Sequence, residues 1–137
     1  MNTELPYWRS LLFVPANQDR FIDGAVKRNA DAYVLDLEDS VPLSEKAETR
    51  NNLQGAVRRL SSSGVEVLVR INRPWRLALR DIEASVADGV KALALPKVPD
   101  HGYVLSLIHI SEPTRRTPRA YAVFCLKKKI GGGGGGG

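Results

Sequence analysis

Four short apolar runs, separated by stretches with helical spacing, constrain the fold of this chain more than any other feature of its sequence. The strand-like runs span residues 11–15, 32–39, 66–72 and 92–98, and the third contains three β-branched residues. Between them, apolar residues recur three to four positions apart, namely Phe21, Ile22, Ala25 and Val26, then Leu53, Ala56, Val57 and Leu60, then Leu79, Ile82 and Val86. This alternation predicts an α/β fold with a parallel sheet and right-handed crossovers. A doubly wound sheet and a barrel both fit the pattern.

Charged residues at the ends of the strand-like runs favour the barrel. Asp36, Glu38 and Asp39 crowd the end of the second run, while Arg70 and Lys97 lie near the ends of the third and fourth. Functional side chains at the C-terminal ends of consecutive parallel strands are the arrangement that a (β/α)₈ barrel offers. The turn after the first run reads Pro-Ala-Asn and lacks the glycine-rich phosphate fingerprint of dinucleotide-binding folds.

Each of these charged residues has a functional and a structural interpretation. Strand alternation places Asp36 and Glu38 on the face of Val34, and charge on an inward face indicates a metal, a cationic partner or an active site. The alternative is the exposed end of an edge strand with solvated acids. Arg70 could hold an oxo-acid or dicarboxylate substrate bidentately, or form a structural ion pair with Asp36 or Glu38. Lys97 could serve the same site or simply extend along the strand end.

Charge divides the chain near residue 104. Residues 1–104 contain fourteen Lys and Arg and fourteen Asp and Glu, whereas residues 105–137 contain six basic residues and one acidic residue. The net charge of +5 therefore comes from the second part, and composition predicts no nucleic-acid or membrane partner for the first. The only cysteine, Cys125, also lies in the second part, and a cysteine-free body fits a reducing compartment. Because no run approaches the roughly 20 apolar residues of a membrane span, we expect a soluble cytoplasmic protein.

The second part, residues 105–137, reads as a non-native tail. This part resembles the conceptual translation of a transposase-type sequencing adapter with its index and homopolymer runs. The resemblance rests on the segment that begins at Leu105, the later run of three lysines and the seven glycines from Gly131. A flexible glycine linker with a basic patch, or a natural low-complexity terminus, is the alternative. We therefore expect residues 105–137 to be disordered, and we assign no function to His109, Cys125 or the lysines 127–129.

Four motifs in residues 1–104 resemble the N-terminal half of the HpcH/HpaI aldolase and citrate lyase superfamily. They are Arg-Ser-Leu-Leu-Phe-Val-Pro at 9–15, Val-Leu-Asp-Leu-Glu-Asp-Ser-Val at 34–41, Val-Leu-Val-Arg-Ile-Asn at 67–72 and Leu-Pro-Lys-Val at 95–98. The nearest branch resembles citrate lyase beta subunit-like proteins and malyl-CoA or citramalyl-CoA lyases. The resemblance implies a TIM barrel, usually in a homo-oligomer. It also implies a Mg²⁺-dependent carbon-carbon lyase that cleaves or forms a 3-hydroxyacyl-CoA thioester, with an acyl-CoA and an oxo acid as its small-molecule partners.

Residue by residue, the resemblance implies specific roles for four positions. Arg70 matches the catalytic arginine that binds the oxo acid and stabilises the enolate-like charge. Glu38 and Asp39 match the acidic pair that orders water around the Mg²⁺ rather than binding it directly. Lys97 matches a lysine near the mouth of the active site, where it would contact substrate.

The family's direct metal ligands lie on its fifth and sixth strands, whereas the family-like sequence here ends after the fourth. We therefore expect residues 1–104 to form a truncated half-barrel of about four βα units with an open edge on its last strand, inactive by itself. Two alternatives are a half-barrel that self-associates into a whole barrel and a noncatalytic binding or regulatory relative.

Overall fold

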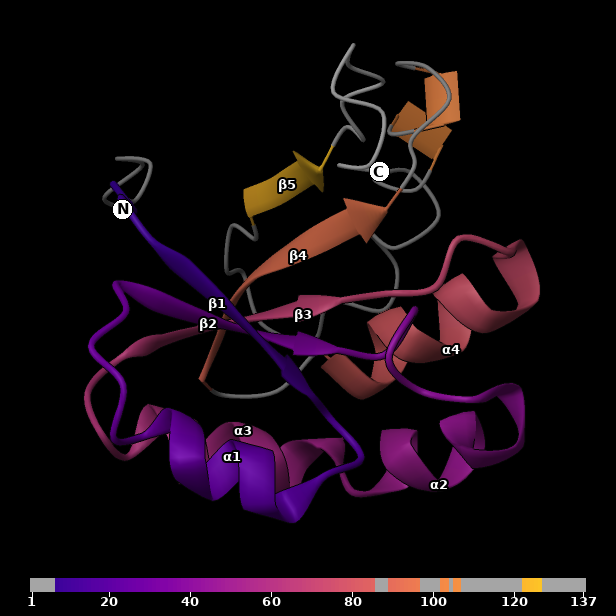
Figure 1. The fold of residues 1–137 in the computed structure, drawn as a ribbon. Helices are drawn as coiled ribbons and strands as arrows, with labels where there is room; N and C mark the ends of the chain where they lie inside the picture. The colour runs from indigo at the N-terminus through magenta and orange to yellow at the C-terminus, as the bar shows by residue number, and fades with distance from the viewer. Residues whose placement is uncertain (1–6, 86–88, 97–101, 104, 107–121, 127–137) are drawn as a thin grey trace, which may run out of the picture.

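The computed structural model describes residues 7–85, 89–96, 102–103, 105–106 and 122–126. Five strands and four α-helices follow one another in the described part of the chain (Figure 1). In order they are β1 (Leu11–Pro15), α1 (Asp19–Ala25), β2 (Ala32–Asp36), the 3₁₀ turn η1 (Leu43–Glu45), α2 (Lys46–Asn51), α3 (Leu53–Ser61), β3 (Glu66–Arg70), α4 (Trp75–Ser85), β4 (Val90–Pro96) and β5 (Ala122–Leu126). The first four strands coincide closely with the four apolar runs of the sequence.

The strands form one parallel sheet whose spatial order, β1-β2-β3-β4-β5, is the order of the chain. The helices lie against one face of this sheet (Figure 1). A doubly wound sheet reverses its strand order and places helices on both faces, so this winding is the one a barrel uses. The fold is therefore a parallel α/β fold consistent with the TIM-barrel superfamily.

The core between the sheet and the helices confirms the predicted face of α3. Leu53, Ala56, Val57 and Leu60 are all buried there, at no more than 5% exposure. They pack in one cluster with strand residues that point to the same side, including Tyr33 and Leu35 on β2 and Val67 and Val69 on β3. The period of the apolar residues was sufficient to place this helix.

The predicted faces of α1 and α4 are only partly correct. In α1, Ile22 and Ala25 are buried, but Phe21 is 45% exposed. In α4, Leu79 lies on the surface while Asp81 faces the core at 1% exposure. The rotation of α4 has a physical cause, because Asp81 forms a buried ion pair with Arg50 of α2. Of the three remaining predicted positions, Ile82 is buried at 3% exposure, Val26 is exposed, and Val86 lies outside the described residues.

The opposite face of the sheet carries smaller side chains. Ala32, Val34, Leu68, Ala92 and Ala94 form a second buried cluster there, against which Trp8 and Leu11 pack. Strand alternation continues this face to Asp36 on β2 and Arg70 on β3. The charged pair therefore lies at the C-terminal end of the face that points away from the helices.

The outer edge of β4 is paired, contrary to the expectation of an open edge. β5 hydrogen-bonds to β4 in parallel, with Ala92 opposite Ala122 and Pro96 opposite Leu126. The expectation that residues 105–137 are disordered is therefore wrong for Ala122–Leu126. An unpaired strand edge exposes a row of N–H and C=O groups, and an apolar run such as Ala-Val-Phe-Cys-Leu is suited to pair with it.

Within the described residues, no helix is both long enough and apolar enough to cross a membrane.

Candidate active site

The register of the sheet brings Asp36 and Arg70 together at the C-terminal ends of β2 and β3. The two residues lie directly opposite each other in the parallel pairing. Arg70 Nε donates to Asp36 Oδ1 at 2.9 Å, and Nη2 donates to Oδ2 at 2.7 Å. This is the bidentate geometry in which a guanidinium holds a carboxylate most firmly. The structural ion pair considered from the sequence is thus present, and its partner is Asp36.

Asp36 is the hub of the site, because its carboxylate also holds the chain that follows. Its oxygens accept the backbone N–H of Glu38 at 2.8 Å and of Ser40 at 3.1 Å, as well as the Ser40 hydroxyl at 2.8 Å. Burial raises the pKa of Asp36, but the hydrogen bonds from Arg70, Glu38 and Ser40 outweigh it and hold the pKa below its ordinary value. Asp36 is therefore a fixed anion.

Arg70 is oriented by three neighbours. Its hydrogen bonds to Asp36 raise its pKa against the opposing effect of burial, so the guanidinium stays charged. The guanidinium carbon lies 4.9 Å from the centre of the Phe13 ring, within reach of a cation–π interaction. Nη2 also lies 3.9 Å from Asp39 Oδ2. Since Asp36 engages Nε and Nη2, Nη1 lies outside the bidentate pair.

Residues 37–40, which we call the acidic turn, carry Glu38 and Asp39. Its start is tied to the sheet by the hydrogen bond from the Leu37 N–H to the Arg70 carbonyl at 3.0 Å. On the helix side, Lys46 Nζ donates to the carbonyl oxygens of Leu37 at 2.9 Å and Glu38 at 2.7 Å. Asp39 thus lies beside Arg70, and the charge of Glu38 contributes to raising the Arg70 pKa.

A buried polar network supports the acidic turn, and sequence reasoning missed it. Asn72 Nδ2 donates to the Leu37 carbonyl at 3.0 Å and to Asp81 Oδ2 at 2.7 Å. Asp81 also accepts the Asn72 N–H at 2.8 Å and Arg50 Nε at 2.9 Å. The sequence feature that could have indicated this network is Asp81, an acid next to the predicted core residue Ile82 on α4.

Glu38 and Asp39 are the residues of the site that could hold a Mg²⁺ ion, through water. Both oxygens of Asp36 are engaged by Arg70, Ser40 and backbone N–H groups, so Asp36 would have to give up these bonds to bind a metal. Glu38 and Asp39 supply carboxylate oxygens, the ligand type that Mg²⁺ prefers. Among the residues that the structure describes, no three or more His, Cys, Asp or Glu side chains cluster as a metal site. Two carboxylates that order water around the ion fit this composition.

Lys97, the fourth residue predicted for the site, lies outside the described residues. Its neighbour Pro96 ends β4, and Ala94 lies opposite Arg70 in the pairing of β3 with β4. The contact of Lys97 with substrate therefore stays a prediction.

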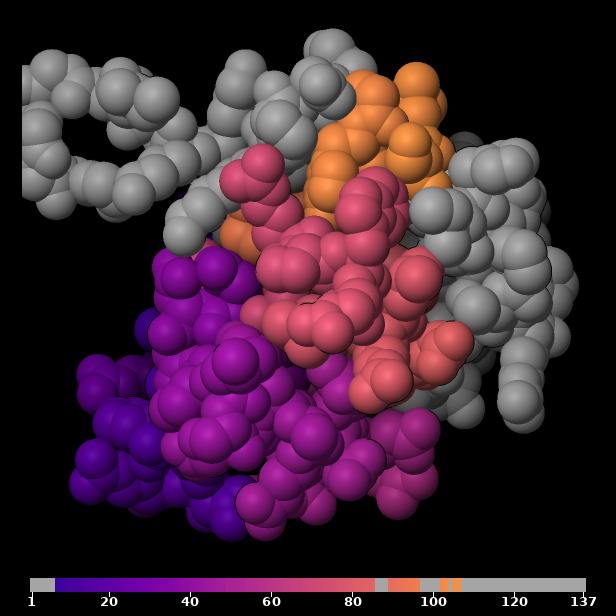
Figure 2. All heavy atoms as spheres, turned by 90° about the vertical axis from the view of Figure 1, so that its right-hand side faces the viewer, coloured from indigo at the N-terminus to yellow at the C-terminus, as the bar shows by residue number. Residues whose placement is uncertain are grey.

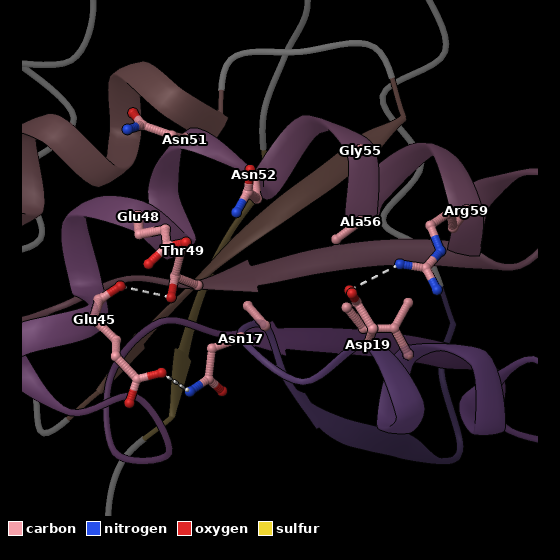
Figure 3. A pocket seen from close by; sticks show the side chains of 12 residues that line it. Asn17, Asp19, Glu45, Glu48, Thr49, Asn51, Asn52, Gly55, Ala56 and Arg59 are labelled. Atoms are coloured by element: carbon pink, nitrogen blue, oxygen red, sulfur yellow. Dashed lines mark hydrogen bonds and ion pairs between the residues drawn. The ribbon is translucent and has the colours of Figure 1, made fainter.

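A polar hollow of about 580 Å³ lies apart from this cluster, between α1, α2 and α3 (Figure 3). On one side Asn17 Nδ2 donates to Glu45 Oε1 at 3.2 Å, and on the other Arg59 pairs with Asp19 at 3.0 Å. None of the residues predicted for the site lines it. The hollow is part of the helical layer.

An apolar groove of about 550 Å³ follows the outer side of β1 and α1. Phe13 and Phe21 line it together with Arg20 and Arg28. Figure 2 shows another side of the molecule, with α4 near the centre of the view. Neither of these two pockets contains the Asp36–Arg70 pair.

Comparison with known families agrees with the α/β fold. Residues 9–123 match the HpcH/HpaI aldolase/citrate lyase family, and the chain belongs to this family. The match begins at the first predicted motif and continues beyond residue 104.

Three characterised relatives show what kinds of protein the chain is similar to. It is 34% identical over 102 residues to the citrate lyase subunit beta of Escherichia coli K12, covering 72% of this chain and 33% of the relative. It is 32% identical over 94 residues to a (3S)-malyl-CoA thioesterase of Cereibacter sphaeroides ATH 2.4.9, covering 66% and 32%. It is 33% identical over 93 residues to the human mitochondrial citramalyl-CoA lyase, covering 66% and 27%. The chain thus matches about a third of the length of these relatives.

Proposed function

We propose that this chain forms the first four βα units of a carbon-carbon lyase site that acts on a 3-hydroxyacyl-CoA thioester. The products of cleavage are an acyl-CoA and an oxo acid. The observation that carries the proposal is the Arg70 guanidinium, fixed bidentately by Asp36 beside Glu38 and Asp39 at the ends of parallel strands. Membership of a family that contains a citrate lyase subunit and a citramalyl-CoA lyase narrows the reaction class.

Arg70 is suited to the charge changes of such a cleavage. The bond between C2 and C3 of the thioester breaks, and its electron pair passes to C2 to give the enolate of the acyl-CoA. The 3-hydroxyl loses its proton to a general base and becomes the oxo group, and C2 then takes up a proton. Because Asp36 holds Nε and Nη2, Arg70 can present Nη1 to the carboxylate or oxo group of the departing acid without reorientation.

Glu38 and Asp39 would hold water around a Mg²⁺ ion in this site. When bound, the ion polarises the oxygen atoms of the oxo acid. The acidic turn keeps Asp39 close to Arg70, so an ion held there would act on the same small acid as the guanidinium. The family resemblance assigns the direct ligands to the fifth and sixth strands of the barrel, and Lys97 to contact with substrate.

Thioester hydrolysis is a second candidate, because one relative is a (3S)-malyl-CoA thioesterase. The two reactions leave different products. A lyase releases an oxo acid and an acyl-CoA with the thioester intact, whereas a hydrolase releases free CoA thiol and a hydroxy acid.

The test is to express the uninterrupted genomic reading frame that contains residues 1–104 and to incubate the protein with malyl-CoA and citramalyl-CoA in the presence of Mg²⁺. The proposal expects equal amounts of oxo acid and acyl-CoA, measured by chromatography. Thiol release without oxo acid would establish the hydrolase instead. Turnover of neither thioester, by a protein that unfolds cooperatively, would contradict both reactions.

A further inference from the structure

The backbone of the acidic turn is held from two opposite sides. From the sheet, the Asp36 carboxylate accepts the N–H groups of Glu38 and Ser40 at 2.8 and 3.1 Å. From the helices, Lys46 Nζ donates to the carbonyl oxygens of Leu37 and Glu38 at 2.9 and 2.7 Å. Removing Lys46 would leave the Leu37 carbonyl with Asn72 Nδ2, at 3.0 Å, and the Glu38 carbonyl with only the longer bond from the Val41 N–H, at 3.4 Å.

The position of Lys46 is not explained by the helix to which it belongs. Lys46 is the first residue of α2 (Lys46–Asn51), where the positive end of the helix dipole disfavours a cation. Burial also lowers its pKa, against the attraction of the surrounding carboxylates of Asp81, Glu38, Asp36 and Asp39. Both costs are offset by the two short bonds to the acidic turn, which indicates that the contact with the turn determines the position of this lysine.

We propose that Lys46 is a positioning residue for the lyase site, an inference that rests on the proposed function. By binding two consecutive carbonyl groups, its ammonium fixes the peptide planes on either side of the Glu38 α-carbon. These planes determine the directions in which the Glu38 and Asp39 side chains leave the turn. Lys46 therefore controls the approach of the two carboxylates to Arg70 without touching substrate.

The direct test is amide hydrogen exchange of the 137-residue chain, measured residue by residue with NMR. Lys46→Met keeps most of the apolar stem and removes the donors, Lys46→Arg keeps donors and charge, and Lys27→Met removes an exposed lysine as the matched control. We expect Lys46→Met to speed exchange of the Glu38 and Ser40 amides by about tenfold, as for the loss of a charged hydrogen bond. Exchange in β3 should stay unchanged, and Lys46→Arg should restore protection.

Wild-type exchange at Glu38 and Ser40 in the Lys46→Met chain would overturn the proposal. If the Lys46→Met variant no longer unfolds cooperatively, a measurement on the wild-type chain still tests whether Lys46 holds the turn. A scalar coupling between the Lys46 side-chain nitrogen and the carbonyl carbons of Leu37 and Glu38 is expected if the ammonium holds the turn. Its absence at low temperature would overturn the assignment of Lys46.

Kinetics separate positioning from general support of the fold. In the enzyme of the proposed function, Lys46→Met should raise the Mg²⁺ concentration for half-activation by about tenfold, with the KM for the thioester unchanged. A raised KM at an unchanged Mg²⁺ requirement would contradict the proposal. If the wild-type protein cleaves no thioester, the proposed function fails, while the exchange measurement still decides the role of Lys46 in holding the turn.

Discussion

Asp36 and Arg70 form an ion pair that leaves part of the guanidinium outside it. The sequence left two interpretations of Arg70, a structural partner of an acid or a binder of substrate. The structure contains the ion pair, but the pair uses only Nε and Nη2 of the guanidinium. The ion pair is therefore compatible with the proposed substrate-binding role of Arg70, since a guanidinium held by a buried carboxylate needs no reordering to bind a second anion.

Removing the anion should destabilise the fold. In Asp36→Asn the Arg70 charge, with a side chain only 18% exposed, loses its partner, and the Ser40 contacts weaken. We expect a loss of about 3 kcal/mol in the free energy of unfolding, measured by urea denaturation. Asp19→Asn, which affects a surface pair with Arg59, is the control and should have a much smaller effect. Equal losses in the two variants would contradict the central position of Asp36.

The lowered pKa of Asp36 predicts a pH dependence of stability. Since its pKa is lower in the folded than in the unfolded chain, the unfolded chain binds more protons, and stability rises with pH in that range. The contribution of Asp36 is complete above its unfolded pKa of about 3.9 and is lost as the pH falls through the folded pKa. The stability difference between wild type and Asp36→Asn should therefore shrink below about pH 4. A difference that is constant from pH 6 to pH 3 would contradict this.

At the scale of helices and strands, the sequence predicted what depends on periodicity. The four strands and the buried face of α3 follow from apolar spacing, and the acids at the end of β2 stood out as charges after an apolar run. The rotation of α4 could not be predicted in this way, because it depends on the pairing of Asp81 with Arg50, far apart in sequence. Lys46 was missed for a similar reason, since its partners are backbone carbonyls that no residue pattern marks.

Gly89, just before β4, illustrates how closely the elements pack. Its φ is +102°, and an added Cβ would lie 3.0 Å from Val57 Cγ1 and 3.2 Å from Ser61 Oγ, both on α3. Gly89→Ala should therefore cost about 2–3 kcal/mol of stability through backbone strain and crowding. Gly24→Ala is the control, because a Cβ there meets nothing within 4 Å and alanine favours the helix. Thermal unfolding should show opposite shifts, and a neutral Gly89→Ala would contradict the described packing.

At the scale of the whole molecule, β5 changes how residues 105–137 are regarded. The adapter-like sequence predicted a disordered tail. A strand could not be predicted there, because the segment had no expected place in the fold. The structure nevertheless places Ala122–Leu126 against β4. That the tail is absent from the natural gene stays a prediction. Resequencing the locus with another library chemistry tests it, and recovery of the codons for residues 105–137 in genomic DNA would contradict it.

Shortening the chain tests whether β5 protects the sheet. A chain of residues 1–104 exposes the backbone groups of β4, and we expect it to self-associate or aggregate more than a chain of residues 1–126, which keeps β5. Size-exclusion chromatography with light scattering measures the difference. A monomeric 1–104 chain with cooperative thermal unfolding would contradict the protective role of β5, whereas a compact dimer would favour the half-barrel that self-associates.

The central claim is that Arg70, Glu38 and Asp39 form part of a lyase site, and the most direct test is steady-state kinetics of acyl-CoA release across a Mg²⁺ titration. Arg70→Lys keeps the charge but removes the bidentate fork, so turnover should fall by roughly two to three powers of ten. Glu38→Gln should mainly weaken Mg²⁺ activation, by about ten- to a hundredfold. Arg76→Lys, an exposed arginine of α4, should have no effect. Wild-type turnover and metal dependence in Arg70→Lys would contradict the account and leave Arg70 as a structural partner of Asp36.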